Sequence, residues 1–139
     1  MTNRILLDTG SLVAILHAKD QHHKSCIETS FEWNGRMLTC WPVITEAAWR
    51  LRAGAQSIIR MWYSIRDATI QLLELDATAA GWMATFLERY RVLGAQLADA
   101  ALMYLAERHG IETGFTLDRR DVSVYRLPDG RALHIVPAP

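Results

Sequence analysis

The chain has 139 residues, of which 50% are hydrophobic, and its formal net charge is zero. This length supports one hydrophobic core, so we expect a single domain over residues 1–139. The zero balance excludes a protein that binds nucleic acid through a strongly basic surface alone. The chain shows neither a membrane-spanning run of about 20 apolar residues nor a signal-peptide pattern, so we expect a cytoplasmic protein.

Short apolar strands alternate with helical segments in the first half of the chain. The stretch "RILLDTGSLVAIL" predicts a strand over residues 5–7 and a helix over 12–18. The pattern after it predicts a loop over 20–23, a helix over 23–33 that ends at Gly35, a strand over 37–39, a turn at Pro42, and helices over 45–52 and 56–65 joined at Gly54.

The second half continues this alternation. The pattern predicts a strand over 70–73, a helix capped by Asp76 or Thr78 that reaches Tyr90, a break at Gly94, a helix over 96–108 that stops at Gly110, a strand "IETGFTLD" that ends on Asp118, and strands over 122–127 and 133–136. Alternating strands and helices predict an α/β protein with a mainly parallel central sheet, helices on both faces, and a ligand crevice at the carboxyl ends of the strands.

Two aspartates end predicted strands at that edge of the sheet. Asp8 follows the first strand and Asp118 follows the fourth, so their carboxylates lie close together if these strands are neighbours. Aspartate is also a common turn and helix-capping residue, and that structural role explains either position on its own.

Two further acids are on helices that are expected to face the crevice. Asp99 shares a helix face with Leu102 and Met103 in "AQLADAALMYLAERHG", so its carboxylate is expected to face inward. A carboxylate there is costly unless a metal ion or an arginine compensates for its charge. Glu46 in "PVITEAAWRL" follows a possible cap at Thr45, and attraction to the helix dipole is a sufficient structural reason for it.

Four carboxylates in one crevice repel one another by about 4 kcal/mol per pair at ~4 Å and an effective dielectric of about 20. Because no lysine follows Lys24, arginines, raised carboxyl pKa values or divalent cations must compensate. Oxygen-only ligands favour Mg²⁺ or Mn²⁺ over zinc. The missing lysine argues against a phosphoaspartate receiver or an aspartate-nucleophile phosphatase, and no glycine-rich phosphate loop is present.

The histidines and cysteines do not have the pattern of a zinc site. His17, His22 and His23 precede Cys26, but no second pair of ligands follows at zinc-site spacing, and Cys40 stands alone. We interpret these histidines as solvent-exposed residues at a helix start and the cysteines as reduced thiols.

Five short motifs together resemble the PIN-domain ribonucleases, and within them the VapC-like toxins of bacterial toxin-antitoxin pairs. They cover nearly the whole chain: "LLDTGSLVAIL", "DQHHKSC", "PVITEAAWRLR", "LADAALMYLAERHGI" and "FTLDRRDVSVYRL". The resemblance implies a three-layer PIN-like fold and an endoribonuclease that hydrolyses RNA phosphodiester bonds with Mg²⁺ or Mn²⁺ as its cofactor. The alternative is a non-catalytic member of the same fold that binds an antitoxin or RNA without cleaving.

The resemblance also implies roles for individual residues. The expected catalytic acids are Asp8, Glu46, Asp99 and Asp118, with Asp121 as a neighbour; Asp8, Asp99 and Asp118 contact the metal, and Glu46 binds a second metal or orients the attacking water. We expect hydrogen bonds to these carboxylates from Thr9, Ser11 and Thr116, and RNA phosphate contacts from Arg119 and Arg120. Many relatives carry further acids at the positions of Val92 and Gln96 and an aromatic residue at Val122, and fewer carboxylates imply a weaker second metal site.

The predicted helical hairpin over 45–65 carries more large apolar side chains than one small core can accommodate. They are Trp49, Leu51, Ile58, Ile59, Trp62 and Ile65. We expect some of them, Ile58 and Trp62 above all, to line an exposed groove that binds a partner helix. The resemblance implies that this partner is an antitoxin whose arginine reaches the acids around Asp8, and we also expect a homodimer.

Overall fold

The structure is a computed structural model that describes residues 3–33 and 36–139. In this part of the chain, five strands form one parallel sheet in the order β3-β2-β1-β4-β5. The strands are β1 (Arg4–Leu7), β2 (Arg36–Thr39), β3 (Ile70–Leu72), β4 (Thr113–Phe115) and β5 (His134–Val136). The α/β class with a parallel sheet, predicted from the sequence, is therefore confirmed.

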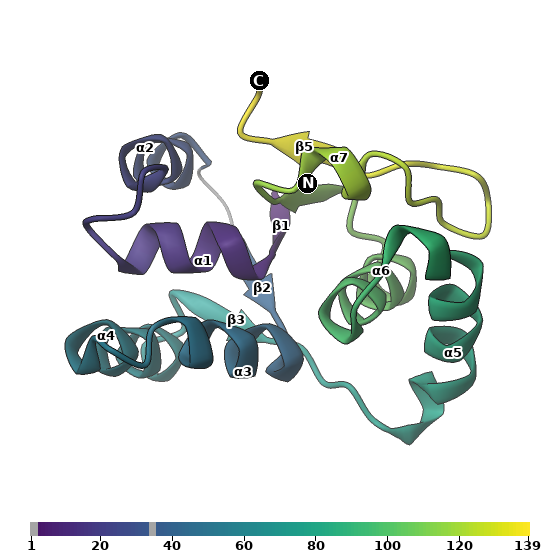
Figure 1. Cartoon of the computed structure of the whole chain (residues 1–139), viewed down its shortest axis with the longest axis horizontal. Coiled ribbons are helices and arrows are strands. Elements are labelled where there is room, and N and C mark those ends of the chain that lie inside the picture. The colour runs from purple at the N-terminus through teal and green to yellow at the C-terminus, as the bar shows by residue number, and fades with distance from the viewer. Residues whose placement is uncertain (1–2, 34–35) are drawn as a thin grey trace.

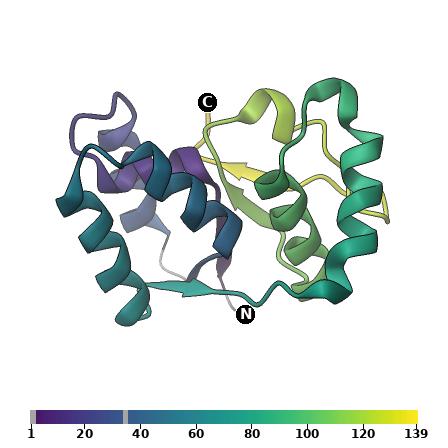
Figure 2. The same ribbon diagram turned by 60° about the horizontal axis from the view of Figure 1, so that its bottom comes forward.

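Helices cover both faces of this sheet. Helices α1 to α4 lie on one side of it, and α5 and α6 lie on the other (Figure 1, Figure 2). The helices are α1 (Thr9–Leu16), α2 (His23–Glu32), α3 (Trp41–Arg50), α4 (Ala55–Arg66), α5 (Ala80–Arg89), α6 (Leu97–His109) and α7 (Arg119–Val122), with 3₁₀ turns η1 (Ala77–Ala79) and η2 (Arg91–Leu93). The three layers match the predicted architecture.

The central strand β1 explains why the sheet is covered on both faces. Ile5, Leu6 and Leu7 are consecutive apolar residues, and all three are buried, as is usual for a parallel strand packed on both sides. β1 pairs with β4 so that Leu7 lies opposite Phe115, and the Asp8 N–H donates to the Phe115 carbonyl at 3.0 Å. This pairing places the end of β1 beside the end of β4.

The helix predicted over 45–52 begins earlier than expected, and the predicted turn at Pro42 is wrong. α3 starts at Trp41, with Pro42 in its first turn, where the missing N–H of proline needs no helical partner. Glu46 therefore lies beyond the first helical turn. The explanation of Glu46 by the helix dipole is wrong for the same reason, because that effect fades within one turn.

The segment after β4 also differs from the prediction. β4 ends at Phe115, and Asp118 instead caps the short helix α7 by accepting a hydrogen bond from the Asp121 N–H at 3.2 Å. The predicted strand over 122–127 is absent from the described structure. Tyr125 from that stretch is buried against Phe86, with ring centroids 5.0 Å apart. The buried apolar residues over 122–127 therefore pack into the core without pairing as a strand.

Smaller differences concern element ends. The segment that Asp76 caps begins with a 3₁₀ turn before α5, and the predicted helix end at Gly35 lies outside the described residues. Gly94 and Gly110 have positive φ values of 73° and 65°, which fits their predicted role in ending helical segments. Among the described helices, none combines the length and apolar character needed to cross a membrane.

Candidate functional site

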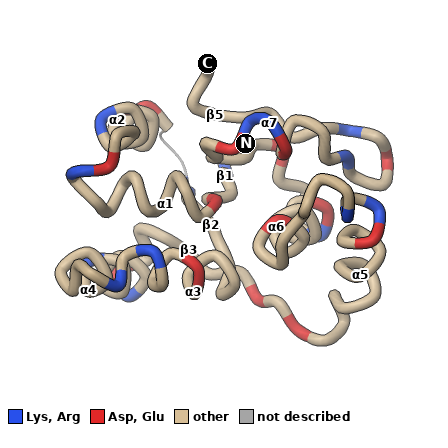
Figure 3. The backbone as a smooth tube through the Cα atoms, in the orientation of Figure 1, with Lys and Arg blue, Asp and Glu red and all other residues tan. Residues whose placement is uncertain are grey.

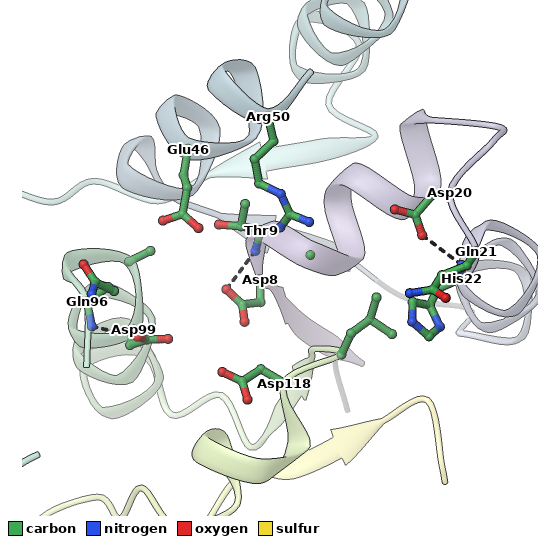
Figure 4. Close-up of a pocket in the computed structure, with 13 residues that line it drawn as sticks. Asp8, Thr9, Asp20, Gln21, His22, Glu46, Arg50, Gln96, Asp99 and Asp118 are labelled. Atoms are coloured by element: carbon green, nitrogen blue, oxygen red, sulfur yellow. Dashed lines mark hydrogen bonds between the residues drawn. The ribbon is translucent and has the colours of Figure 1, made fainter. Parts of the chain in front are cut away.

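A cavity of about 440 Å³ opens at the carboxyl edge of the sheet, where β1 and β4 end. All four acids predicted from the sequence line it: Asp8, Glu46, Asp99 and Asp118 (Figure 4). They come from the end of β1, from α3, from the first turn of α6 and from the residue before α7. Figure 3 shows acidic positions on both groups of helices, and Figure 4 shows that these four acids surround one central region.

Asp8 forms the floor of this cavity. One carboxylate oxygen accepts a hydrogen bond from the Thr9 N–H at 2.7 Å, and the other accepts one from the Thr116 hydroxyl at 2.8 Å. Burial raises the pKa of Asp8, these two hydrogen bonds lower it, and the nearby charges of Glu46 and Asp118 raise it again, for a net increase. The fold thus holds a carboxylate where its ionised form is disfavoured.

Asp99 caps its own helix and faces the cavity as well. Its carboxylate accepts a hydrogen bond from the Gln96 N–H at 2.8 Å as part of a capping box. Burial, the largest cause, and the charges of Asp8, Asp118 and Glu46 raise the pKa of Asp99 to about 6, although the bond from Gln96 lowers it. The inward face predicted for this helix is confirmed by buried Leu102 and Met103.

Glu46 and Asp118 lie at the rim, and both residues are exposed. In the described part of the chain, the side-chain ion pairs join Arg66 with Asp67 and Arg131 with Glu112 and Asp129. None of the four cavity acids takes part in them, so the alternative of a structural arginine pair for Asp99 is not realised there.

The residues expected to support these carboxylates do so unequally. The Thr116 hydroxyl donates to Asp8 as predicted and also accepts the Asp118 N–H at 3.0 Å. Thr9 uses its backbone, while its buried hydroxyl has no hydrogen-bond partner among the described residues. The prediction for Ser11 is wrong: its hydroxyl bonds the carbonyl oxygens of Asp8 and Phe115 and ties α1 to β4. The Asp121 N–H bonds Asp118.

The residues predicted to contact RNA also differ from one another. The Arg119 guanidinium donates to the carbonyl oxygens of Ile135 and Pro137, so it fastens α7 to the end of β5. Arg120 is exposed. Of the positions where relatives carry further acids, Gln96 lines the cavity, whereas the Val92 side chain is 97% exposed and lies outside the lining.

Besides Gly10, Ala98 and Leu117, four polar or charged residues that line the cavity were not predicted from the sequence. Arg50 reaches its wall from α3, and Asp20, Gln21 and His22 form its far end (Figure 4). Arg50 follows Glu46 by four residues, and this spacing on one helix face was the available signal. His22 had been interpreted as a solvent-exposed helix-start residue; it is exposed, but it also faces the cavity.

The residue types in the cavity fit a hard divalent cation. Carboxylate oxygens are the ligands that Mg²⁺ and Mn²⁺ prefer. Burial first, and then repulsion by the other acids, raise the pKa values of Asp8 and Asp99, and a bound cation would offset both effects. In the described part of the chain, no three histidine, cysteine, aspartate or glutamate side chains form a ready-made metal site. Mg²⁺ commonly binds through one or two carboxylates and keeps several waters, so this arrangement suits it.

Comparison with known proteins extends these observations. No protein-family profile matches the chain. The chain is 25% identical over 138 residues to Ribonuclease VapC26 of Mycobacterium tuberculosis, which covers 96% of this chain and 100% of that protein.

Solved structures share the fold. VapC20 of Mycobacterium tuberculosis, a sarcin-ricin loop cleaving toxin, has a TM-score of 0.75 at 17% identity over 86% of this chain and 93% of that chain. A toxin-antitoxin complex from Klebsiella pneumoniae has a TM-score of 0.69 at 16% identity over 96% of each chain. The relative at 25% identity supports the resemblance that the sequence motifs predicted, and the solved structures confirm the predicted fold.

Proposed function

We propose that this VapC-like PIN-domain chain is a metal-dependent endoribonuclease and the toxin of a toxin-antitoxin pair. One observation carries the proposal: four acids from four separate elements meet in one cavity at the carboxyl edge of the sheet. Capping explains Asp8, Asp99 and Asp118 one at a time, but it does not explain why their carboxylates share a cavity or why burial and mutual repulsion are tolerated there.

The chain's own residues divide the work of hydrolysis. Asp8 and Asp99 would hold the cation from the floor, with Asp118 completing its environment directly or through water. The Thr116 hydroxyl fixes the orientation of Asp8, because it bonds a carboxylate oxygen and the Asp118 N–H together. Glu46, on a long and exposed side chain, would orient the attacking water or hold a second cation. A bound divalent cation would supply acidification of water and neutralisation of charge on the phosphate.

RNA cleavage with and without the cation tests this proposal. The first probe is a sarcin-ricin loop oligoribonucleotide, because VapC20 cleaves that loop, and total cellular RNA is the second. We expect cleavage by the purified protein in MgCl₂ or MnCl₂ and its loss in EDTA. Undiminished cleavage in EDTA would contradict the metal-dependent mechanism.

A second candidate is a non-catalytic PIN-fold protein that binds RNA or an antitoxin. Arg50, the one arginine among the described residues that line the cavity, favours this candidate, because binding a phosphate group needs a positive side chain and no catalysis. Expression without a partner separates the two candidates. A ribonuclease toxin arrests growth, whereas harmless accumulation of folded protein that binds but never cuts RNA would support the non-catalytic protein.

The partner surface we propose lies on the hairpin of α3 and α4. Its exposed side chains are Trp41, Trp49, Ile59, Trp62 and Tyr63, with exposures from 42% to 65%. The rings of Trp41 and Trp62 pack 5.7 Å apart. Of the six apolar side chains predicted for this hairpin, Trp49, Ile59 and Trp62 are exposed. Leu51 is buried, and Ile58 and Ile65 are half-buried against the core, so Ile58 contributes less to this surface than Trp62 does.

We propose that an antitoxin helix covers this aromatic surface and that the protein forms a homodimer. Large exposed aromatic groups favour protein contact, since burying about 300 Å² of apolar surface contributes about 7 kcal/mol before association costs. Trp62→Asp is expected to weaken antitoxin binding about tenfold or more, and Ile58→Asp is expected to weaken it as well. Titration of each variant with the antitoxin, alongside RNA cleavage by the free protein, checks this; unchanged antitoxin affinity would place the partner elsewhere.

A further inference from the structure

A second, positively charged corner of the cavity lies beside the four acids. It is formed by the first turn of α1, at Thr9 and Gly10, and by the guanidinium of Arg50 from α3 (Figure 4). An imaginary Cβ on Gly10 would lie 3.8 Å from the Arg50 Nη1 atom, so the guanidinium stands directly over the backbone of this turn. Neither the capping of α1 nor the packing of the core uses this arrangement.

Gly10 has no structural reason to be glycine. It lies in a helix with a negative φ, since it is absent from the glycines with positive φ, and a helical glycine is less favourable than alanine. A methyl group there would meet Arg50 at 3.8 Å and Leu117 at 3.9 Å, which are ordinary contact distances. The free chain has space for a side chain at Gly10. Close approach of a ligand to the backbone is the remaining physical use of a glycine at this position.

The charges of this corner suit an anion. Arg50 is the lone lysine or arginine among the described residues that line the cavity, and its guanidinium forms no ion pair in the described part of the chain. The N-terminal turn of α1 adds the positive end of a helix dipole. The Asp8 carboxylate already accepts the Thr9 N–H, so, among the described residues, the N–H groups of Gly10 and Ser11 are the ones in this turn that remain without a helical partner. Arginine and a helix N-terminus are both common binding partners of phosphate groups.

Thr9 provides an independent indication of a ligand. Its residue is 2% exposed and lines the same cavity, yet its hydroxyl oxygen has no hydrogen-bond partner among the described residues. A buried hydroxyl without a partner is costly, so such groups usually serve a bound molecule or water. The polar group left without a partner therefore lies in the same helical turn as the bare backbone of Gly10.

We propose that Gly10, Thr9 and Arg50 form a binding site for one phosphate group of the RNA backbone, adjacent to the four acids. The inference rests on the proposed ribonuclease function and assigns it a substrate-positioning site. The acids at one end of the cavity would hold the cation, and the first turn of α1 with Arg50 would fix the phosphodiester chain in register with it. Glu46 lies one helical turn from Arg50, so the same helix positions one of the four acids and the guanidinium.

Gly10→Ala and its matched control Gly81→Ala test this site. Both glycines occupy the second position of a helix, Gly81 in α5, where a Cβ would meet nothing within 4 Å. Binding is measured by fluorescence anisotropy with a short labelled mixed-sequence oligoribonucleotide in MgCl₂, on an Asp99→Asn background that prevents cleavage. We expect Gly10→Ala to weaken RNA binding about tenfold, because its methyl group occupies the space beside the guanidinium, and Gly81→Ala to leave it unchanged. Neither variant should lower the Tm.

Arg50→Gln tests the charge of the site. Removing one phosphate contact should reduce the slope of log K against log salt concentration by about 0.7 for single-stranded RNA. Arg52→Gln is the control, since Arg52 packs over the Trp49 ring outside the cavity lining and should leave the slope unchanged.

The outcomes separate this inference from the proposed function. Absence of RNA binding and cleavage in the unmodified protein would overturn both. Normal RNA binding in Gly10→Ala, or equal losses in Gly10→Ala and Gly81→Ala, would overturn the phosphate site alone. A lower Tm in Gly10→Ala would remove its value as a probe, and the salt slope of Arg50→Gln would then decide, with an unchanged slope overturning the site.

Discussion

The floor and the rim of the acid cavity are built in different ways. On the floor, Asp8 is fixed by two hydrogen bonds at the end of the central strand β1, and Asp99 is fixed in a capping box. At the rim, Glu46 and Asp118 are exposed to solvent. The fold therefore partly buries and restrains Asp8 and Asp99, whereas it leaves Glu46 and Asp118 in contact with solvent.

The physical reason is solvent access. A carboxylate at the floor loses hydration and faces other negative charges, so its pKa rises, as for Asp8 and Asp99. A carboxylate at the rim keeps its water and can move. We therefore expect floor substitutions to change both stability and activity, and a substitution of Glu46 at the rim to change activity alone.

The largest effect is expected for Asp8→Asn. Cleavage should fall about 100-fold or more, because a carboxylate that we propose as a ligand of the cation is lost. The Tm at neutral pH should stay the same or rise, because a buried charge with repulsive neighbours is removed. RNA cleavage assays and thermal unfolding in EDTA measure the two effects, and Glu46→Gln is the rim control with reduced cleavage at unchanged Tm. Unfolding of Asp8→Asn would mean that Asp8 is chiefly structural.

A smaller effect is expected for Thr116→Val, which keeps the shape of the side chain and removes its hydroxyl. Asp8 and the Asp118 N–H each lose a partner, so the free energy of unfolding should fall by about 1–3 kcal/mol. Urea unfolding measures it. Thr116→Ser, which keeps the hydroxyl, should retain most of that stability; an equal loss in both variants would point to packing instead.

The pH dependence of stability should separate Asp99 from the rim. Its pKa is about 6 in the folded chain against 3.8 ordinarily, so between these values the folded state binds more protons than the unfolded state. The contribution of Asp99 to the free energy of unfolding is therefore fully present below pH 3.8 and is lost as the pH rises through about 6. The free energy of unfolding of the unmodified protein in EDTA, minus that of Asp99→Asn, should fall over this window. A flat difference would contradict the raised pKa.

The smallest effect, with the opposite sign, is expected for Thr9→Val. Removing a buried hydroxyl that lacks a partner should leave the free energy of unfolding unchanged or raise it by about 1 kcal/mol. Urea unfolding beside Thr116→Val gives the comparison, since both substitutions remove one hydroxyl from the same cavity floor. A loss of stability as large as that of Thr116→Val would show that the Thr9 hydroxyl already has a partner.

Much of this architecture is predictable from local sequence. The run Ile5 to Leu7 is apolar without alternation, which indicates a strand buried on both faces, and Asp8 marks its end. Gly110 indicates the end of α6 because its positive φ suits glycine. The errors have equally specific causes: Pro42 is compatible with both a turn and a helix start, and the apolar residues over 122–127 are buried at irregular spacing that resembles a strand.

Local pattern determined the parallel α/β class, the identity of the four acids and the family resemblance, because strands, helices and caps depend on near neighbours along the chain. Tertiary structure alone decided that β1 and β4 are adjacent, that Thr116 rather than Ser11 bonds the Asp8 carboxylate, and that Arg50 lies beside Gly10. These contacts join residues far apart in sequence. Burial and charge, which set the pKa of Asp8 and Asp99, depend on every segment around them, so they exist only once the chain has folded.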